Sequence, residues 1–485
     1  MKLTKNDNNQ MDFLAIDVFT FTPHLEASGE ICIEQMAFND GVCHCFINVE
    51  NPDDTYSYNE WGYSKKYKVS QLHKVLKRKG VGVFYDNLPK PHAFSTDTDH
   101  FTENNNFTIE GLRALKYKGA NLGIGVLSSI ISKTKDSEPD LAALSDLVQL
   151  YLRSATEVYD RSIRLIKLYK PKKLLVFNGR LALCKAISEA AKDQGVEVVY
   201  HERGATIDRY QVVNMPIHDF KGIRSRRDQL WEQAEEGKEE VARDFFERRR
   251  SGDGIGWLSF IDHQQPNEKP EKTKARRLVY FSSSDDEYAA VEDGLEQKLF
   301  KSQRSAILWL IDWIGNQEDV ALFIRIHPHV AQKSKGDQVW WSALSGKNVQ
   351  VIPPNDITDS YALAESADIV VSFGSTMGVE STYWGVPSIL IGDAMYSGLD
   401  CVYEPKNIND LRSLLETTDL PIKPKENCFS HGYYGLSFGV PYKYFKPEGL
   451  FLGTFFGERL TYESRFHQIL RRSKQRKLFG KTGKS

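Results

Sequence analysis

Short, continuous apolar runs separated by helix-like segments mark the second half of the chain. The runs are LVYF (278–281), ALFIRI (321–326), VQVI (349–352), DIVVSF (368–373) and PSILI (387–391). Helical stretches such as Ala306–Ile314 and Ile357–Ala364 lie between them. Continuous apolar strands alternating with helices are typical of a parallel sheet covered on both faces. This half is therefore predicted to form a Rossmann-like α/β domain.

The first half shows the same alternation less regularly. Phe13–Ile16 and Val42–Val49 read as strands, and a helix is predicted between them over Ile31–Phe38, after a loop that contains Pro23. A second unit follows, with a strand at 174–177, a helix over Leu181–Ala191 that Gly195 ends, and a strand at 196–200. Strand, helix, strand is the unit of a parallel sheet, so a second α/β domain is predicted here.

Two polar segments suggest where the domains divide. Residues 263–276 are charged and contain two prolines, which is typical of an exposed linker. Before them, Lys221–Arg250 is predicted to be a surface helix or helix pair with one apolar stripe. The predicted parts are an N-terminal α/β domain, the linker, a C-terminal α/β domain, and a final helix after Pro447 that returns to the first domain and ends in a basic tail. Their bounds are 1–262, 263–276, 277–445 and 446–485.

Composition and charge narrow the function classes. A chain of 485 residues suits two domains, and 63 basic against 65 acidic residues argue against nucleic acid as the main partner. The N-terminus lacks the apolar core of a secretion signal, and no apolar run reaches the roughly 20 residues of a membrane-spanning helix. A cytoplasmic protein is expected. Cys43 and Cys45 flank His44, but no second ligand pair has zinc spacing, so core packing is favoured over a metal site.

The clearest candidate for a binding site is the segment 372–387, SFGSTMGVESTYWGVP. A strand ends before Gly374, small residues follow, and a helix is predicted to begin near Met377 and to stop at Gly385. Backbone N–H groups at such a turn bind anions, and Ser375 and Thr376 add hydroxyl donors. Glu380, one turn into the helix, is expected to face the same mouth, where a carboxylate accepts the hydroxyls of a ribose. A well-capped structural helix is the alternative.

These residues resemble a known donor-nucleotide motif. Gly-Ser-Thr-x-Gly-x-Glu (374–380), followed by Trp-Gly-Val-Pro (384–387), resembles the motif of GT-B glycosyltransferases. More narrowly, the chain resembles bacterial capsule polysaccharide biosynthesis proteins, a group that includes Kdo transferases. The supporting segments are Thr22–Glu26, Phe177–Arg180, His201–Gly204 and Arg325–Pro328. The resemblance implies two Rossmann-like domains with parallel sheets facing a central cleft, the acceptor side in 1–262 and the nucleotide-sugar-binding side in 277–445. It also implies that the loop with Gly374, Ser375, Thr376 and Gly378 meets the phosphates and that Glu380 takes the ribose.

Two further segments are candidate donor contacts. Arg325 and His327 close a predicted strand, and a histidine before proline resembles the element with which CMP-sugar transferases hold the donor phosphate. A structural histidine is the alternative. Ser282, Ser283 and Ser284 follow the first strand of the second domain and offer hydroxyl and backbone donors to phosphate or acceptor. Asp285 and Asp286 are expected to cap the next helix rather than to bind metal.

Catalytic candidates lie in the first domain. Sugar transfer needs a general base for the acceptor hydroxyl or a carboxylate nucleophile. His24 and Glu26, after the first strand, and Glu202, after the strand ending at Tyr200, are expected in loops that face the cleft; capping or ion-pair roles are the alternative. Asn178, Gly179 and Arg180 are candidates for positioning the acceptor. Asp97-Thr98-Asp99 matches the metal signature of another glycosyltransferase fold, but it lies in a polar stretch with no strand before it.

The sequence therefore predicts a glycosyltransferase that uses a nucleotide sugar as substrate and needs no cofactor or metal. A CMP-linked donor such as CMP-Kdo is favoured, although UDP and GDP sugars fit the same loop. The expected acceptor is a bacterial surface polysaccharide or a lipid-linked glycan. The basic tail 471–485 suits contact with the inner face of the cell membrane. Alternatives are a CDP-alcohol glycerophosphotransferase, a nucleotide-sugar epimerase and a non-catalytic scaffold for capsule assembly.

Overall fold

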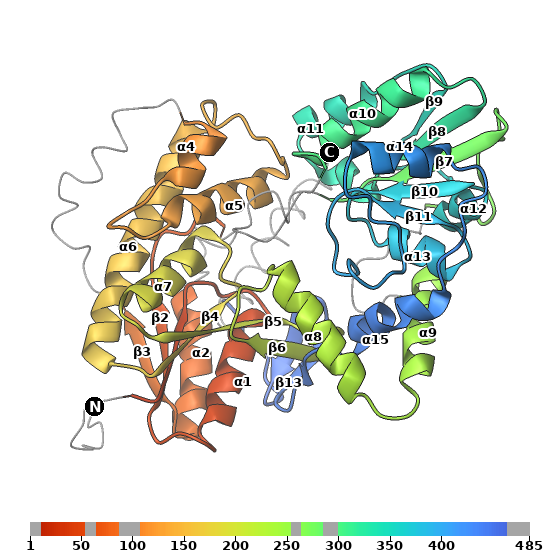
Figure 1. Ribbon diagram of the computed structural model, residues 1–485. Coiled ribbons are helices and arrows are strands. Elements are labelled where there is room, and N and C mark those ends of the chain that lie inside the picture. The colour runs from red at the N-terminus through yellow and green to blue at the C-terminus, as the bar shows by residue number, and fades with distance from the viewer. Residues whose placement is uncertain (1–10, 54–64, 87–106, 254–262, 285–298, 463–485) are drawn as a thin grey trace, which may run out of the picture. The chain divides into compact units, whose positions relative to one another are not determined.

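The protein divides into two compact units. The computed structural model describes residues 11–53, 65–86, 107–253, 263–284 and 299–462. Unit 1 comprises residues 1–130, 140–217 and 439–485, and unit 2 comprises residues 131–139 and 218–438. The elements of each unit are labelled in Figure 1.

Unit 1 is built on a seven-stranded sheet in the order β12-β6-β5-β4-β1-β2-β3. The strands are β1 (Phe13–Asp17), β2 (Val42–Ile47), β3 (Gly82–Asp86), β4 (Lys173–Phe177), β5 (Glu197–Arg203), β6 (Arg209–Val213) and β12 (Val440–Pro441). The five strands from β5 to β3 run parallel, while β6 and β12 are antiparallel to their neighbours. This is the strand order of a doubly wound Rossmann-like sheet with an antiparallel extension.

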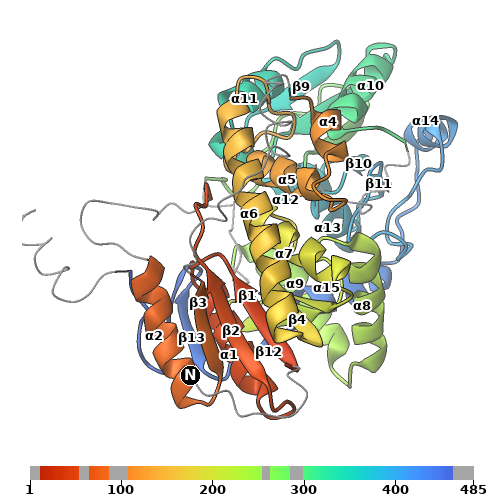
Figure 2. The same ribbon diagram turned by 90° about the vertical axis from the view of Figure 1, so that its left-hand side faces the viewer.

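Helices cover both faces of this sheet. They are α1 (His24–Gln35), α2 (Lys65–Arg78), α4 (Ile109–Ala114), α5 (Leu122–Thr134), α6 (Ser145–Tyr169) and α7 (Ala182–Asp193). Figure 2 shows α1 and α2 on one side of the sheet and α6 and α7 on the other. Apolar side chains such as Leu25 and Leu72 pack against Phe13 and Phe46 to form one core layer.

Unit 2 holds a five-stranded sheet in the order β11-β10-β7-β8-β9, with every pair parallel. The strands are β7 (Arg276–Phe281), β8 (Val320–Arg325), β9 (Val349–Ile352), β10 (Ile369–Ser372) and β11 (Ser388–Leu390). Its helices include α8 (Phe220–Gln233), α9 (Lys238–Ser251), α10 (Gln303–Gly315), α11 (Lys335–Ser342), α12 (Ser360–Glu365), α13 (Met377–Tyr383), α14 (Ile408–Glu416) and α15 (Phe429–Ser437). The 3-10 helices are η2 (Pro328–Gln332) and η3 (Lys425–Cys428).

The predicted fold class is confirmed: each unit is a Rossmann-like α/β sheet, parallel throughout in unit 2 and parallel with an antiparallel extension in unit 1. In unit 2 the five apolar runs coincide with β7 to β11 to within a few residues. The side chains of β7, β8, β10 and β11 are almost all buried because helices cover both faces of the sheet, while the edge strand β9 is only partly buried. The helix predicted near Met377 begins there, and Gly385, at φ +86°, follows its end, as expected of a glycine that stops a helix.

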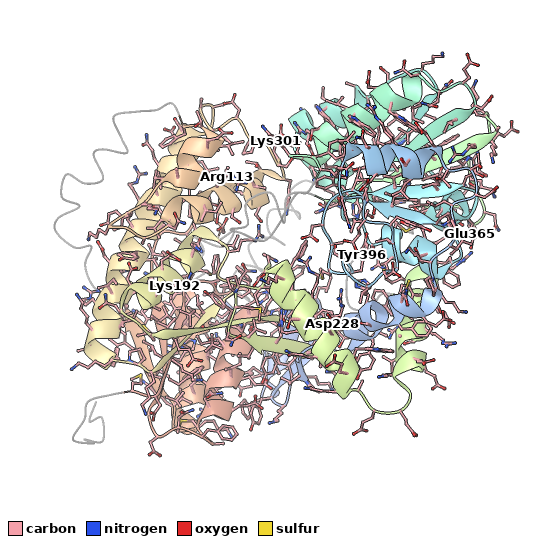
Figure 3. All side chains as sticks on the ribbon, in the orientation of Figure 1. Arg113, Lys192, Asp228, Lys301, Glu365 and Tyr396 are labelled. Atoms are coloured by element: carbon pink, nitrogen blue, oxygen red, sulfur yellow. The ribbon has the colours of Figure 1, made fainter. Side chains whose placement is uncertain are left out.

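The division of the chain differs from the predicted boundaries, because α8 and α9 group with unit 2. Phe246 of α9 stacks on Tyr383 of α13, with ring centroids 4.1 Å apart. Arg227 of α8 donates to the carbonyl of Met395, and Arg224 pairs with Asp393 at 2.7 Å. The apolar side chains of this helix pair therefore pack against α13 and α15 of unit 2. Charged side chains such as Asp228 of α8 remain on the outside (Figure 3).

Two elements of unit 1 extend further than predicted, and both corrections involve candidate residues. Helix α1 begins at His24, so His24 and Glu26 lie in its first turn and not in a loop. Most of α1 is buried, including polar residues, which hides its start from hydrophobic patterning. Strand β5 continues through Glu202 because β6 pairs with it, Glu202 lying opposite Gln211.

The chain returns to unit 1 at residue 439, before the predicted position after Pro447, and it does so as strands in the described part. β12 joins the large sheet, and β13 (Phe445–Gly449) and β14 (Leu452–Phe455) form an antiparallel hairpin. The carboxylate of Glu30, fully buried on α1, accepts backbone N–H bonds from Lys443, from Tyr444 at 3.2 Å and from Phe445 at 2.8 Å. Glu30 therefore attaches the returning segment to the first helix.

We expect Glu30→Ala to lower the melting temperature of unit 1 by roughly 5–10 °C, because unpartnered buried donors cost about 1–3 kcal/mol each. Differential scanning calorimetry measures the shift. Lys443→Ala is the control, since it keeps the backbone N–H and removes only an exposed side chain that pairs with Glu34. An equal loss in both variants would show that the surface ion pair, and not Glu30, holds the segment.

Among the described residues, no helix combines the length and the apolar character needed to cross a bilayer. The basic tail 471–485 lies outside the described residues, as do Asp97, Asp99, Asp285 and Asp286. The membrane contact and the helix cap predicted there stay predictions.

Candidate functional site

The carboxyl edge of the unit 2 sheet gathers most of the predicted donor residues. β7 and β10 are neighbours, with Phe281 opposite Ser372, and the chain leaves them toward opposite sides of the sheet. In open α/β sheets this switch point is where ligands bind. Ser282–Ser284 follow β7, His327 follows β8, and Gly374–Thr376 follow β10.

These loops meet in space. The backbone N–H of His327 donates to Ser282 Oγ at 2.8 Å, which joins the loops after β7 and β8. A Cβ atom built on Gly374 would lie 3.9 Å from Ser283 Oγ and 2.9 Å from the carbonyl oxygen of Asp393. A side chain at position 374 would therefore crowd the edge where the three loops converge, and glycine leaves the backbone accessible.

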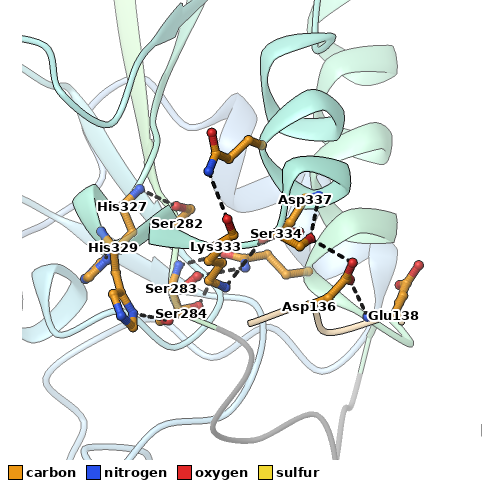
Figure 4. A network of polar contacts seen from close by, with 12 residues as sticks. Asp136, Glu138, Ser282, Ser283, Ser284, His327, His329, Lys333, Ser334 and Asp337 are labelled. Atoms are coloured by element: carbon orange, nitrogen blue, oxygen red, sulfur yellow. Dashed lines mark hydrogen bonds and ion pairs between the residues drawn. The ribbon is translucent and has the colours of Figure 1, made fainter. Parts of the chain in front are cut away.

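The His327 ring is held in one tautomer. Its Nδ1 accepts the backbone N–H of His329 at 3.1 Å, which caps the 3-10 helix η2 (Figure 4). A ring nitrogen that accepts a hydrogen bond carries no proton, so the neutral imidazole has its hydrogen on Nε2. His329 in turn lies with Nδ1 3.1 Å from Ser284 Oγ. The polar groups of this edge therefore form one connected network, with an N–H donor on His327.

Gln303, at the start of α10, holds the serine loop and was not predicted from the sequence. Its side-chain oxygen accepts the backbone N–H of Ser283 at 2.8 Å, and its nitrogen donates to the Ser283 carbonyl at 3.1 Å. Tyr280 donates to the same oxygen at 3.0 Å. The amide is almost fully buried, so it fixes the backbone of Ser283 in one position. No local sequence pattern marks a glutamine for this task.

Arg325 differs from its prediction as a phosphate ligand. Its side chain is buried and donates to the backbone carbonyls of Pro353 and of Asp356, the latter at 3.3 Å. Burial lowers the pKa of Arg325. The guanidinium therefore fixes the loop after β9, and it does not share the accessible position of His327.

Side chains from other elements contact the loop after β10, and two of its candidate donor residues, Gly378 and Glu380, have structural partners. Tyr396 donates to the Ser375 carbonyl at 2.7 Å, and its hydroxyl would lie 2.4 Å from a Cβ on Gly378, so Gly378 serves close packing. Glu380 is fully buried and does not face a mouth. Its carboxylate accepts Arg249 Nε at 3.0 Å and the hydroxyl of Tyr361. Ribose contact by Glu380, which the resemblance implied, stays a prediction.

A second polar cluster lies at the carboxyl edge of the unit 1 sheet. His24 Nδ1 lies 3.5 Å from Glu202 Oε1, and Asn178 Nδ2 donates to Glu202 Oε2 at 2.7 Å. Asn178 is held at φ +58° in the turn after β4, and Gly179, at φ +79°, has Tyr200 where a side chain would be. The structure therefore brings together three of the residues that the sequence singled out.

The surroundings of His24 and Glu202 shift their pKa values in opposite directions. Burial lowers the pKa of His24 well below its usual value, and the nearby Arg203 charge acts in the same direction. Burial raises the pKa of Glu202, and the Asn178 hydrogen bond partly opposes it. The Glu202 side chain keeps 18% of its surface exposed. A partly exposed carboxylate with a raised pKa suits a general base, and neutral His24 can accept or donate one hydrogen bond beside it.

Glu26 does not join this cluster. Its Oε1 lies 3.1 Å from Lys68 Nζ and accepts the Thr22 hydroxyl at 2.9 Å, and the pair is almost fully buried. The contacts of Glu26 are therefore those of an ion pair inside the fold.

No cluster of metal-ligating side chains occurs among the described residues. Cys43 and Cys45 lie buried on β2 as free thiols, and burial raises the pKa of Cys43 to about 12. These thiols therefore pack as core residues, as predicted.

Comparison with known proteins yields similar structures only. No protein-family model and no curated protein matches the chain. A Thermosulfurimonas dismutans KpsC structure, a beta Kdo 2,4 transferase, is 14% identical over 62% of this chain and 87% of its own, with a TM-score of 0.36. The KpsC beta Kdo 2,7 transferase of the same organism is 15% identical over 65% and 89%, with a TM-score of 0.33. A putative UDP-N-acetylglucosamine 2-epimerase from Listeria monocytogenes is 11% identical over 90% and 92%, with a TM-score of 0.26. Similarities of this size assign no activity.

Proposed function

We propose that the protein is a glycosyltransferase that moves a sugar from a nucleotide donor to a glycan hydroxyl. The observation that carries this proposal is the meeting of the loops after β7, β8 and β10 at the switch point of unit 2. Serine hydroxyls, backbone N–H groups and the Nε2–H of His327 offer donors there for a phosphate. His327-Pro328 favours a CMP-linked sugar, because this pair resembles the phosphate-binding element of CMP-sugar transferases.

The proposed reaction needs a general base and groups that stabilise the leaving phosphate. Glu202 of unit 1 is the candidate base, and its carboxylate takes the proton of the acceptor hydroxyl. The oxygen of that hydroxyl forms the bond to the anomeric carbon. The bond from that carbon to the phosphate oxygen breaks, and its electron pair leaves with the nucleotide. Unit 2 stabilises the leaving phosphate with the His327 N–H and the serine loop. The donor is a substrate in this scheme.

Thermal-shift measurements with CMP, CDP, UDP and GDP test the proposal. Saturating ligand raises the melting temperature of the folded state by mass action. We expect CMP to stabilise the wild type and to have little effect on His327→Ala. His263→Ala is the control, because His263 is exposed in the segment before β7.

The same panel separates the alternatives. Stabilisation by UDP with turnover in the absence of an acceptor would favour an epimerase. A CMP-sugar transferase and a CDP-alcohol phosphotransferase both release CMP, so the mass of the product distinguishes these two. A protein that responds to none of the four nucleotides would contradict the transferase and leave the scaffold function.

A further inference from the structure

A cationic side chain reaches the loop after β10 from outside the sheet. Arg249 lies in the last turn of α9, which carries three arginines at 248–250. The stacking of Phe246 on Tyr383 sets α9 against α13. Arg249 therefore faces the start of α13, although 127 residues separate it from Thr376.

The contacts of Arg249 link the donor loop to Glu380. Its NH2 group donates to Thr376 Oγ1 at 3.1 Å, and its Nε donates to Glu380 Oε1 at 3.0 Å. The side chain keeps 35% of its surface exposed, while Glu380 is fully buried beneath it. A guanidinium carries five N–H donors in a planar fork, and the fork matches the oxygens of a phosphate. Glu380 and Thr376 engage two of these donors, and the Tyr361 hydroxyl is a further partner of the guanidinium.

The proposed donor site needs a positively charged group to balance the charge of a nucleotide phosphate. The serines and the Gly374–Thr376 loop are neutral, and His327 is neutral in the tautomer that its Nδ1 contact fixes. A nucleotide phosphate is an anion, and hydrogen bonds to it from a charged donor are roughly twice as strong as those between neutral groups. Arg249 supplies a positive charge at the same loop.

We infer that Arg249 is a phosphate-binding residue of the nucleotide site and that Glu380 acts as its buried counter-ion. This inference rests on the proposed function of unit 2 and names a ligand contact that the sequence motif does not contain. It assigns Glu380 a role different from ribose binding. The two roles predict opposite effects when the Glu380 charge is removed.

Isothermal titration of the full-length protein with CMP and with cytidine tests the assignment. Arg249→Met is expected to weaken the binding of CMP by about 10-fold to 100-fold, the range for a lost charge-assisted hydrogen bond. The affinity for cytidine should stay unchanged. Arg248→Met is the matched control: Arg248 is one residue away, is 33% exposed and pairs with Asp244 and Asp253. It should bind CMP as the wild type does.

Glu380→Gln is expected to have the opposite effect on the affinity for CMP. If Glu380 only balances Arg249, its neutralisation leaves the guanidinium with more positive potential, and CMP binding should tighten. If Glu380 holds the ribose, both CMP and cytidine should weaken. Weaker binding of both ligands would overturn the counter-ion role.

Arg249→Met alone leaves the Glu380 carboxylate buried without its cation, which can destabilise the fold. The double variant Arg249→Met/Glu380→Gln removes both charges and carries the test if the single variant does not fold. Wild-type affinity for CMP in the folded single or double variant would overturn the inference and leave the proposed function intact. Failure of the wild type to bind CMP, CDP, UDP or GDP would instead overturn the proposed function.

Discussion

Glu202→Gln is expected to lower the rate of donor turnover by about 100-fold to 10,000-fold, the range that a positioned general base contributes. Glutamine keeps the size of the side chain and an oxygen for the Asn178 hydrogen bond, but it cannot take a proton at neutral pH. The measurement is release of nucleotide from the sugar nucleotide that the protein binds, with water as the minimal acceptor. CMP affinity is the control, because unit 2 holds the proposed nucleotide site, and it should stay at the wild-type value.

The pH profile of the same reaction tests the role of Asn178. The base must be deprotonated, so the rate should rise with pH through the raised pKa of Glu202. Asn178 donates to the carboxylate and thereby lowers this pKa, so Asn178→Gly should move the acidic limb to higher pH. Glycine accepts the φ of +58° at this position, which keeps the turn. An unchanged limb together with an active Glu202→Gln variant would place the base elsewhere, with His24 the next candidate.

The parallel sheet of unit 2 follows directly from the sequence. Most of its strands are short apolar runs because helices cover both faces of the sheet. Such runs can be recognised without knowing which strands pair with them. The loops at their carboxyl ends contain the small and hydroxylated residues that mark a binding edge. The positions of Ser282–Ser284, His327 and Gly374–Thr376 were predictable for this reason.

Residues whose partners are distant in the chain were not predictable in the same way. Arg325 and His327 differ in role although one residue separates them, because the loop after β9 supplies the carbonyls that take the Arg325 donors. Gln303 and Arg249 act through contacts with Ser283 and Thr376, and nothing in their neighbours along the sequence indicates this. Hydrophobic patterning locates elements, but it does not locate the partners of buried polar groups.

The first unit shows how buried polar residues obscure patterning. Helix α1 contains His24, Glu26 and Glu30 in buried positions, so its apolar face could not be recognised before Ile31. Each of the three has a specific partner in the folded chain: Glu202, Lys68 and the backbone at 443–445. The same arrangement that hid the helix places a histidine beside the candidate base.

Acidification is expected to destabilise the protein steeply below pH 6.5, because buried histidines stay neutral in the folded state. Burial lowers the pKa of His201 to about 4, and of His73 and His431 to about 3, from an ordinary value of 6.5. The unfolded chain binds these protons first as the pH falls. Each histidine therefore removes about 1.4 kcal/mol of unfolding free energy per pH unit between 6.5 and its folded pKa. The raised pKa of Glu30 acts in the opposite direction and offsets part of this loss near its own pKa.

His201→Leu isolates one histidine. His201 is fully buried, and neither ring nitrogen has a hydrogen-bond partner among the described residues, so leucine of similar size should keep or raise the stability at pH 7.5. The charges that act on its pKa come from Asp17, which raises it, and His44, which lowers it. Denaturant unfolding at pH 7.5 and pH 5 should show a loss on acidification about 2 kcal/mol smaller in the variant than in the wild type. An equal loss in both proteins would mean that His201 already carries a proton in the folded state at pH 5. The burial of its ring, with no hydrogen-bond partner on either nitrogen among the described residues, argues against this.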